Sequence, residues 1–491
     1  MTFKIGANVI NRRPSIIKFS RTAHASLGVI LVVPLYLLSI SGTLVVWFEE
    51  FQRWEQPEVT EFSTYTTTQI NRAVKQILPK LDIPPETIFI VLPTSAAPRL
   101  HVSASQQEWF VDGQGNLETP LATPWTSMLM EFHNHLLLPE LVGLIITGSL
   151  GAILCTLIIN GWLAHPNLIK DLFRLRWHGQ PRLRHLDIHN RLGIWGSPFY
   201  FMIALTGTFF GLLGPFIAAG AFLWYDNDRE ALIGQIYGND PHVSQSATPV
   251  NYQVALDALA LYEPTAQPIY FMVQRPGQKD QFLEIAATLP GRLIYSEIYR
   301  FHSDGRIINH QGLSDGPVGR QIAYSIYRLH FGHFGGVYTK VIYSVFGLAL
   351  VVICVSGMNS WLLTQQFQHL RHLWLGLTLS VPIGFVLAAI ASLYYTPTTP
   401  TFLGATTLCI LAALILKHLH QVRTLLLGIL TVSLIALIAS YFLRYELHNW
   451  NNAVWSINLT LCLIGVVTGT ACIRSTRSQS KLNNSQRIQN N

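Results

Sequence analysis

Long apolar stretches alternate with polar segments along the whole of this 491-residue chain. A helix needs about 20 mostly apolar residues to cross the hydrocarbon core of a bilayer. Eight stretches approach or exceed this length, at residues 25–48, 132–163, 190–213, 324–363, 372–395, 402–417, 424–443 and 453–473. The pattern therefore predicts a polytopic α-helical membrane protein with eight transmembrane helices.

Two long polar segments follow the first and third of these helices, and both carry the same order of periodicities. A helical pattern comes first, at 69–81 in one segment and at 252–261 in the other. Strand-like alternation comes next, at 87–92, 99–105 and 108–111, and again at 268–274, 281–287 and 297–301. Each segment is expected to fold as a small α+β module of one helix and three strands.

These apolar and polar segments divide the chain into nine parts. They are an N-terminal segment with helix 1 (1–48), a first module (49–125), helix 2 (126–163), a basic loop (164–189), helix 3 (190–224), a second module (225–322), helix 4 (323–365), helices 5 to 8 (366–474) and a polar tail (475–491). The tail is rich in Ser, Asn and Gln, a composition that predicts disorder.

Composition and charge support a membrane protein and exclude one class of partner. Half of the residues are hydrophobic and only 12% are charged, with a mean hydropathy of +0.32. A formal net charge of +7 would suit nucleic acid, but the Lys and Arg residues cluster beside apolar stretches. The positive-inside rule explains this clustering and predicts that both termini are cytoplasmic and both modules lie outside. No nucleic-acid partner is expected.

The cysteines limit the kinds of metal site that are possible. The chain has five, each placed singly in an apolar stretch: Cys155, Cys354, Cys409, Cys462 and Cys472. Neither a disulfide framework nor an iron–sulfur cluster has the grouped ligands it requires. A redox metal in this protein would therefore have to use histidine.

Four histidines take matching places at the starts of the first four helices. His24 and His189 come at the cytoplasmic level, whereas His133 and His330 come at the outer level. A glycine follows each of them at a matching distance, 18 residues on in the first two cases and 28 and 27 in the others. The residues reached are Ser41-Gly42, Thr206-Gly207, Gly161 and Gly357. This spacing predicts a duplicated four-helix core, built twice from helix, module and helix.

Two repeats related by an axis along the membrane normal would bring the histidines of each level face to face. Facing imidazoles suit the axial positions of a haem, and ligation would satisfy rings that are costly in lipid. His24 and His189 are the candidate inner ligands, and His133 and His330 the candidate outer ligands. His135 and His333 remain alternatives at the outer level. Nearby glycines would leave room for a macrocycle: Gly28, Gly193, Gly332, Gly335 and Gly336.

Zinc is less suited to these positions than haem. The histidines are far apart in sequence, and neither a carboxylate nor a cysteine accompanies them. The remaining histidines of the cytoplasmic loops are expected to be solvated. No dinucleotide-binding glycine motif follows a predicted strand, so the sequence does not indicate an electron donor.

These motifs resemble the PepSY-associated transmembrane family, which includes iron-regulated bacterial membrane proteins and siderophore reductases. The resemblance covers about residues 15–365, through His24-x3-Gly28, His133, Asp187-x-His189-x3-Gly193 and His330-x-Gly332-x2-Gly335. It implies PepSY-like modules, two b-type haems and a multi-pass protein of the bacterial inner membrane. By this resemblance, electrons pass from a cytoplasmic flavoprotein or a quinol to ferric iron or a ferric siderophore outside. Residues beyond 365 lie outside the resemblance.

Two other classes of function remain open from the sequence. A non-enzymatic sensor or protease regulator could bind peptides along the strand edges of its modules. A transporter could use helices 5 to 8, although these spans lack the acidic and Arg residues that ion coupling would use. For a ferric chelate, basic and aromatic residues of the outer segments are candidate contacts: Arg99, His101, Trp109, Arg275, Lys279 and His302.

Overall fold

A computed structural model describes residues 14–165, 176, 180–245 and 248–489 of the chain. Within these residues, eight helices are long and apolar enough to cross a membrane. They are α1 (Pro14–Val45), α5 (Glu140–Ala164), α7 (Ser197–Trp224), α11 (Gly336–Leu362), α12 (Gln368–Leu393), α13 (Thr398–Ile415), α14 (Leu419–Arg444) and α15 (Asn452–Gln489). The expected number of spans is confirmed.

Three of the predicted helices are broken where a single helix was expected. Short helices α4 (Pro124–His135) and α10 (Val318–Phe331) precede α5 and α11, and α6 (Pro181–Trp195) precedes α7. Left-handed residues, Leu136 and Gly332, end α4 and α10. Pro139 then prevents α4 from continuing into α5, because proline lacks an amide hydrogen and disfavours helix before it. The histidines expected at the outer level, His133 and His330, therefore lie on α4 and α10 and not on the spanning helices.

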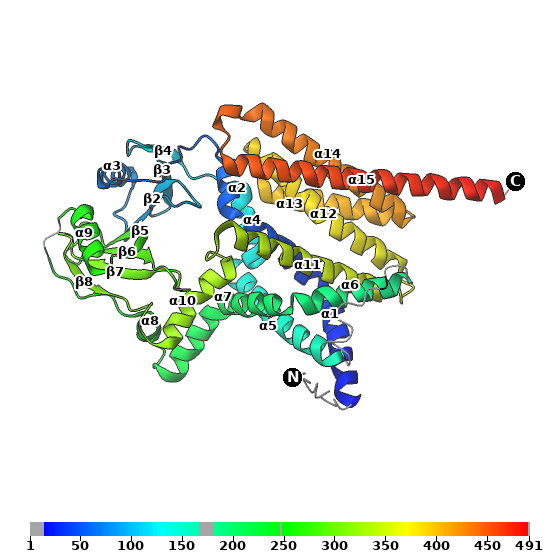
Figure 1. The fold of residues 1–491 in the computed structure, drawn as a ribbon, viewed down its shortest axis with the longest axis horizontal. Helices are drawn as coiled ribbons and strands as arrows, with labels where there is room; N and C mark the ends of the chain where they lie inside the picture. The colour runs from blue at the N-terminus through cyan, green and yellow to red at the C-terminus, as the bar shows by residue number, and fades with distance from the viewer. Residues whose placement is uncertain (1–13, 166–175, 177–179, 246–247, 490–491) are drawn as a thin grey trace, which may run out of the picture.

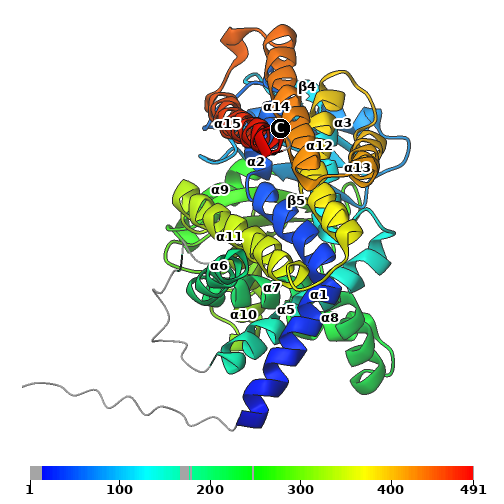
Figure 2. The ribbon, with the colours of Figure 1, turned by 90° about the vertical axis from the view of Figure 1, so that its right-hand side faces the viewer.

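The helices form two neighbouring groups (Figures 1 and 2). In the first, α1 packs against α5 and α11, α5 packs against α7, and α6 packs against α11. In the second, α12 packs against α13 and α14, and α14 packs against α15. The first group carries His24 on α1 and His189 on α6, and the second group lies along one side of it.

The two polar modules share one sheet, a feature that the sequence did not predict. The strands are β1 (Thr87–Val91), β2 (Leu100–Ala104), β3 (Gln107–Val111), β4 (Leu117–Pro120), β5 (Gln267–Gln274), β6 (Phe282–Thr288), β7 (Glu297–Phe301) and β8 (Ile307–His310). They form an antiparallel eight-stranded sheet in the order β4-β3-β2-β1-β5-β6-β7-β8. Pairing of β1 with β5 joins the modules, with Phe89 opposite Met272.

Each half of the sheet has four strands where three were expected. The additional strands, β4 and β8, have four residues each, and both are paired with a shift of register. Such short strands show too little alternation to be recognised in a sequence. Helices α3 (Thr67–Ile77) and α9 (Tyr252–Tyr262) occupy the expected places and pack on one face of the sheet, where their apolar side chains share a core with Ile90 and Phe271.

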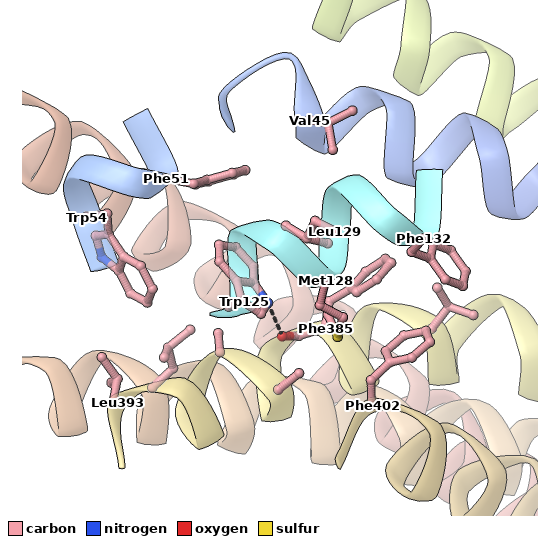
Figure 3. Close-up of a cluster of buried hydrophobic side chains, with 14 of the residues drawn as sticks. Val45, Phe51, Trp54, Trp125, Met128, Leu129, Phe132, Phe385, Leu393 and Phe402 are labelled. Atoms are coloured by element: carbon pink, nitrogen blue, oxygen red, sulfur yellow. Dashed lines mark hydrogen bonds between the residues drawn. The ribbon is translucent and has the colours of Figure 1, made fainter. Parts of the chain in front are cut away.

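The short helix α2 (Phe48–Glu55) and helix α4 connect the two helical groups (Figure 3). Trp54 of α2 stacks on Tyr441 of α14, with ring centres 4.8 Å apart. Trp125 of α4 donates its indole N–H to the carbonyl of Phe385 at 3.0 Å. Phe132, next to His133, packs edge-on against Phe385 and Phe402. The second group of helices therefore holds α4, the helix that carries His133.

The buried carboxylate of Glu55 fixes the start of α4. Its oxygens accept hydrogen bonds from the backbone N–H groups of Trp125 and Thr126 and from the Thr126 hydroxyl, at 2.6–2.9 Å. Free N–H groups and the positive end of the helix dipole favour a carboxylate at this position. Burial raises the pKa of Glu55, against the opposing effect of these bonds.

The polar tail continues α15 as a helix to Gln489, whereas disorder was expected. No proline or glycine follows Arg474 to interrupt the backbone hydrogen bonds. Figure 1 shows α15 reaching well beyond the ends of the neighbouring helices, on the side away from the sheet.

Candidate functional site

The first pair of predicted histidines meets at the end of the core that faces away from the sheet. His24 of α1 and His189 of α6 have ring centres 5.9 Å apart, with their planes at 80°. The Nδ1 atom of His24 lies 2.8 Å from the carbonyl oxygen of Leu157, and that of His189 lies 3.0 Å from the carbonyl oxygen of Ile353. We refer to these two residues as the distal pair.

The second pair meets near the sheet. His133 at the end of α4 and His330 at the end of α10 have ring centres 6.3 Å apart, with their planes at 31°. Nδ1 of His133 lies 3.2 Å from the Ser41 hydroxyl oxygen, and Nδ1 of His330 lies 2.8 Å from the Thr206 hydroxyl oxygen. We refer to these histidines as the sheet-side pair.

The hydrogen bonds select the same tautomer in all four rings. A carbonyl oxygen can only accept, so Nδ1 of His24 and of His189 must carry the proton. The hydroxyls of Ser41 and Thr206 donate to backbone carbonyls of their own helices, at 2.8 Å in each case. Each hydroxyl oxygen is then left to accept from the histidine beside it. In every neutral ring, Nε2 is therefore the nitrogen with a lone pair that can bind a metal.

A glycine lies against each of the four rings. A Cβ added at Gly42 would lie 2.8 Å from Cε1 of His133, and one added at Gly357 would lie 2.9 Å from Nδ1 of His189. At Gly161 and Gly207, the corresponding closest distances to His24 and His330 are both 3.4 Å. The absence of a side chain at these positions lets the rings approach the neighbouring helices. These are the glycines that the sequence spacing marked.

A cavity of about 790 Å³ adjoins the distal pair. Both histidines line it, together with apolar side chains of α1, α5 and α11. Gly28 and Gly193 also line it, and a Cβ at either glycine would meet nothing within 4 Å. The lining also contains the cations Arg21 and Arg182. The cavity thus has two nitrogens that can bind a metal, an apolar lining, and two arginines that could pair with a carboxylate of a bound ligand.

Burial keeps the sheet-side rings neutral. Desolvation lowers the pKa of His133 to about 4 and that of His330 to about 3, with His133 adding to the effect on His330.

The two pairs are separated along α1. Eighteen residues of α1 separate His24 from Gly42, the residue that His133 contacts. At 1.5 Å per residue, the two pairs lie about 27 Å apart along this helix.

The alternative histidines lie beside the sheet-side pair and are not among its contacting rings. His135 packs against Gly143, and its Nδ1 atom is buried without a hydrogen-bond partner. His333 follows α10, and the centre of its ring lies 6.0 Å from that of Phe48 and 5.9 Å from that of Tyr327. The glycines expected to leave room nearby have backbone roles, since Gly332 and Gly336 adopt positive φ at the break between α10 and α11.

Several cations in or beside the two polar modules are engaged in structural contacts. Lys340 at the start of α11 forms ion pairs with Glu49 and Glu50 at 2.9 and 2.7 Å. Arg99 is only 4% exposed and pairs with Glu61 at 3.2 Å. Arg275 pairs with acidic neighbours on its own module. These contacts account for two of the cations, Arg99 and Arg275, that were candidates for a chelate.

The motif residue Asp187 has a structural partner as well. Its buried carboxylate accepts hydrogen bonds from the backbone N–H and the guanidinium of Arg176 at 2.7–2.9 Å. These bonds lower the pKa of Asp187. Most of the basic loop before it, including Lys170 and Arg174, lies outside the described residues.

Comparison with known proteins assigns this architecture to a family. The model of the PepSY-associated TM region matches residues 21–363. The chain belongs to this family. It is also 24% identical over 256 residues to an uncharacterised Pseudomonas aeruginosa protein, PA4219. That match covers 49% of this chain and 64% of the relative, so the chain spans less than two thirds of the relative's length. Helices α12 to α15 lie beyond the family match.

The sequence identified the four histidines but not the groups that orient them. Ser41 and Thr206 were visible only as part of a repeated spacing, and no role followed from it. The carbonyl groups of Leu157 and Ile353 have no sequence signal, because every residue carries one.

Proposed function

We propose that the protein is a transmembrane dihaem b-type cytochrome, and that its core of α1, α5, α7 and α11 is an internal duplication. The histidine pairs support the proposal. A metal about 2.0 Å from each of two imidazole nitrogens sets the ring centres roughly 6 Å apart. The separations of 5.9 and 6.3 Å agree with this arrangement.

The donor set favours haem over a bare metal ion. Among the described residues, no group of three or more His, Cys, Asp or Glu comes together to hold a metal. A structural zinc site needs four protein ligands and a catalytic site usually three. A pair of imidazoles suffices where a porphyrin supplies the other four nitrogens. Haem iron so ligated gains and loses a single electron.

Residues of this chain would bind the two haems and adjust their properties. The distal pair, His24 and His189, and the sheet-side pair, His133 and His330, would ligate through Nε2. The acceptors at Nδ1 fix each ring and raise its basicity. Arg21 and Arg182, which line the distal cavity, would form ion pairs with the carboxylates of the haem bound there.

We propose that electrons move from the distal pair towards the sheet side and reduce ferric iron or a ferric siderophore there. Positive residues beside the apolar stretches favour a cytoplasmic distal side, with both termini inside a bacterial inner membrane. The donor would be a cytoplasmic flavoprotein or a membrane quinol. The activity would be that of a ferric reductase.

A visible spectrum of the purified full-length protein tests the proposal. Dithionite-reduced protein from haem-replete cells should show b-type bands with two haems per chain. The variants His189→Ala and His133→Ala should each retain one haem. The exposed residue His369 of α12 provides a control, since His369→Ala should retain both. A colourless wild-type protein, or full haem content in both ligand variants, would refute the assignment.

The sensor alternative makes the opposite prediction for the same variants. A peptide-binding protein would use the free edges of the sheet, β4 and β8. Its function would survive replacement of all four histidines. The histidine variants therefore discriminate between the two classes.

A further inference from the structure

A second cavity lies at the ends of the membrane helices that face away from the sheet. Its volume is about 750 Å³. It lies between the two helical groups, lined by the start of α6, the end of α11, the starts of α12 and α14 and the later part of α15. None of the four candidate histidines lines it.

The charged side chains of this cavity are all positive. Its lining includes three arginines, Arg371, Arg423 and Arg474, and the described residues that form it include no Asp or Glu. Arg371 is held in place, because its guanidinium donates to the carbonyls of Leu362 and Gln365 at 2.9 Å. Arg423 and Arg474 have exposed side chains that can turn towards a ligand.

The rest of the lining is largely apolar. Leucine side chains from three helices contribute, together with Val467 and Ala471 of α15; the leucines are Leu362, Leu363, Leu375 and Leu419. A free phosphate ion would fill only two or three water volumes of about 30 Å³ each. The cavity is several times larger, and its leucines would gain nothing from a small hydrated anion. Its ligand should therefore be both anionic and apolar.

We propose that this cavity binds an anionic phospholipid, with the headgroup phosphate on Arg423 and Arg474 and the upper acyl chains on the leucines. Basic pockets between membrane helices, at the level of the headgroups, are suited to such lipids. The bound lipid would bridge the family core and the additional helices α12, α14 and α15. This site is independent of the proposed haem function.

Native mass spectrometry of the full-length protein in detergent can test the site. Phosphatidylglycerol should remain bound at least about tenfold better than phosphatidylcholine, because two arginines contribute to its retention. In the double variant R423Q/R474Q this preference should fall to near parity. Arg444 lies at the opposite end of α14 and is exposed, so R444Q should keep the wild-type preference.

Inorganic phosphate distinguishes a lipid from a small anion. At millimolar concentration, it should leave phosphatidylglycerol bound to the wild-type protein. Complete displacement by phosphate would overturn the proposal in favour of a small-anion site. An unchanged lipid preference in the double variant would also overturn it. Should the double variant fail to fold, R423Q and R474Q separately carry the same test, each with a partial loss of preference expected.

Discussion

At the scale of single residues, the site depends on what lies behind each imidazole. The four Nδ1 atoms face two carbonyls and two hydroxyls, and all of these direct the lone pair to Nε2. A metal ligand held in this way loses affinity when its partner is removed, by about 10–100-fold in characterised sites. The hydroxyls can be changed by mutation, whereas the carbonyls cannot.

The substitution Thr206→Val should weaken haem binding at the sheet-side pair about tenfold, because His330 loses its acceptor. The less basic ring should also shift the midpoint potential of that haem to a more positive value. Haem titration and redox potentiometry would measure both effects. Among the described residues, the Thr208 hydroxyl donates to the carbonyl of Ala204 on its own helix and to no histidine, so Thr208→Val is the matched control. Equal effects of both variants would contradict the assigned role.

The glycines beside the rings give a graded prediction. Alanine at Gly42 or Gly357 would lie within 3.0 Å of an imidazole atom, a distance that forces the ring to move. At Gly161 and Gly207, the closest approach of 3.4 Å is tolerable with a small shift. We therefore expect G42A and G357A to lose most of the haem of the affected pair, while G161A and G207A retain most of it. Similar pigment content in all four variants would disprove the ranking.

At the scale of elements, the short helices α4 and α10 deliver the sheet-side histidines. Helix α10 is tied to the second module through Arg328, which donates to the carbonyls of Arg292 and Ile294. Helix α4 is tied instead to α12 and α13, through Trp125 and Phe132. The two partners of this pair are therefore positioned by different parts of the molecule.

Phe132→Ala should destabilise α4 and disturb the sheet-side pair without affecting the distal pair. Removing a buried phenyl ring typically costs about 3–5 kcal/mol, so the melting temperature should fall. The sheet-side haem should be lost in part, while the distal haem remains. Phe222 on α7 is 73% exposed, and Phe222→Ala should change neither property. Equal loss of both haems in F132A would argue against local positioning.

At the scale of the whole molecule, the two modules form one continuous sheet because β1 pairs with β5. We call the β1–β5 pairing the seam. Phe89 and Tyr270 stack across it with ring centres 4.8 Å apart, and Phe271 stacks on Tyr252 of α9. The segment after α1 and the segment after α7 each supply four strands to this continuous sheet.

A disulfide can test the seam. Phe89 and Met272 are directly opposed, and opposed residues in antiparallel strands have Cβ atoms about 4.5–5.5 Å apart. The pair F89C/M272C should cross-link on mild oxidation, as shown by faster gel migration or by mass spectrometry. Gln267 lies five residues along β5, about 17 Å away, so F89C/Q267C should not cross-link. Separate modules would give no cross-link in either variant.

The sequence by itself determined the local elements and the chemistry available to them. Apolar length specified the eight spans, alternation specified six of the eight strands, and repeated spacing singled out His24, His133, His189 and His330. The spans and strands depend on near neighbours in the chain, and the histidine spacing depends only on counting along it. Both kinds of signal are therefore present in the linear order of the residues.

Tertiary structure decided which groups meet. Hydrogen bonds between distant strands joined the modules into one sheet, and the breaks before α5, α7 and α11 set the rings opposite one another. Packing of α4 against Phe385 and Phe402 gave the additional helices a place beside the site. Such contacts join residues hundreds of positions apart. Their free energy depends on surfaces that exist only after the chain has folded, and no local pattern encodes them.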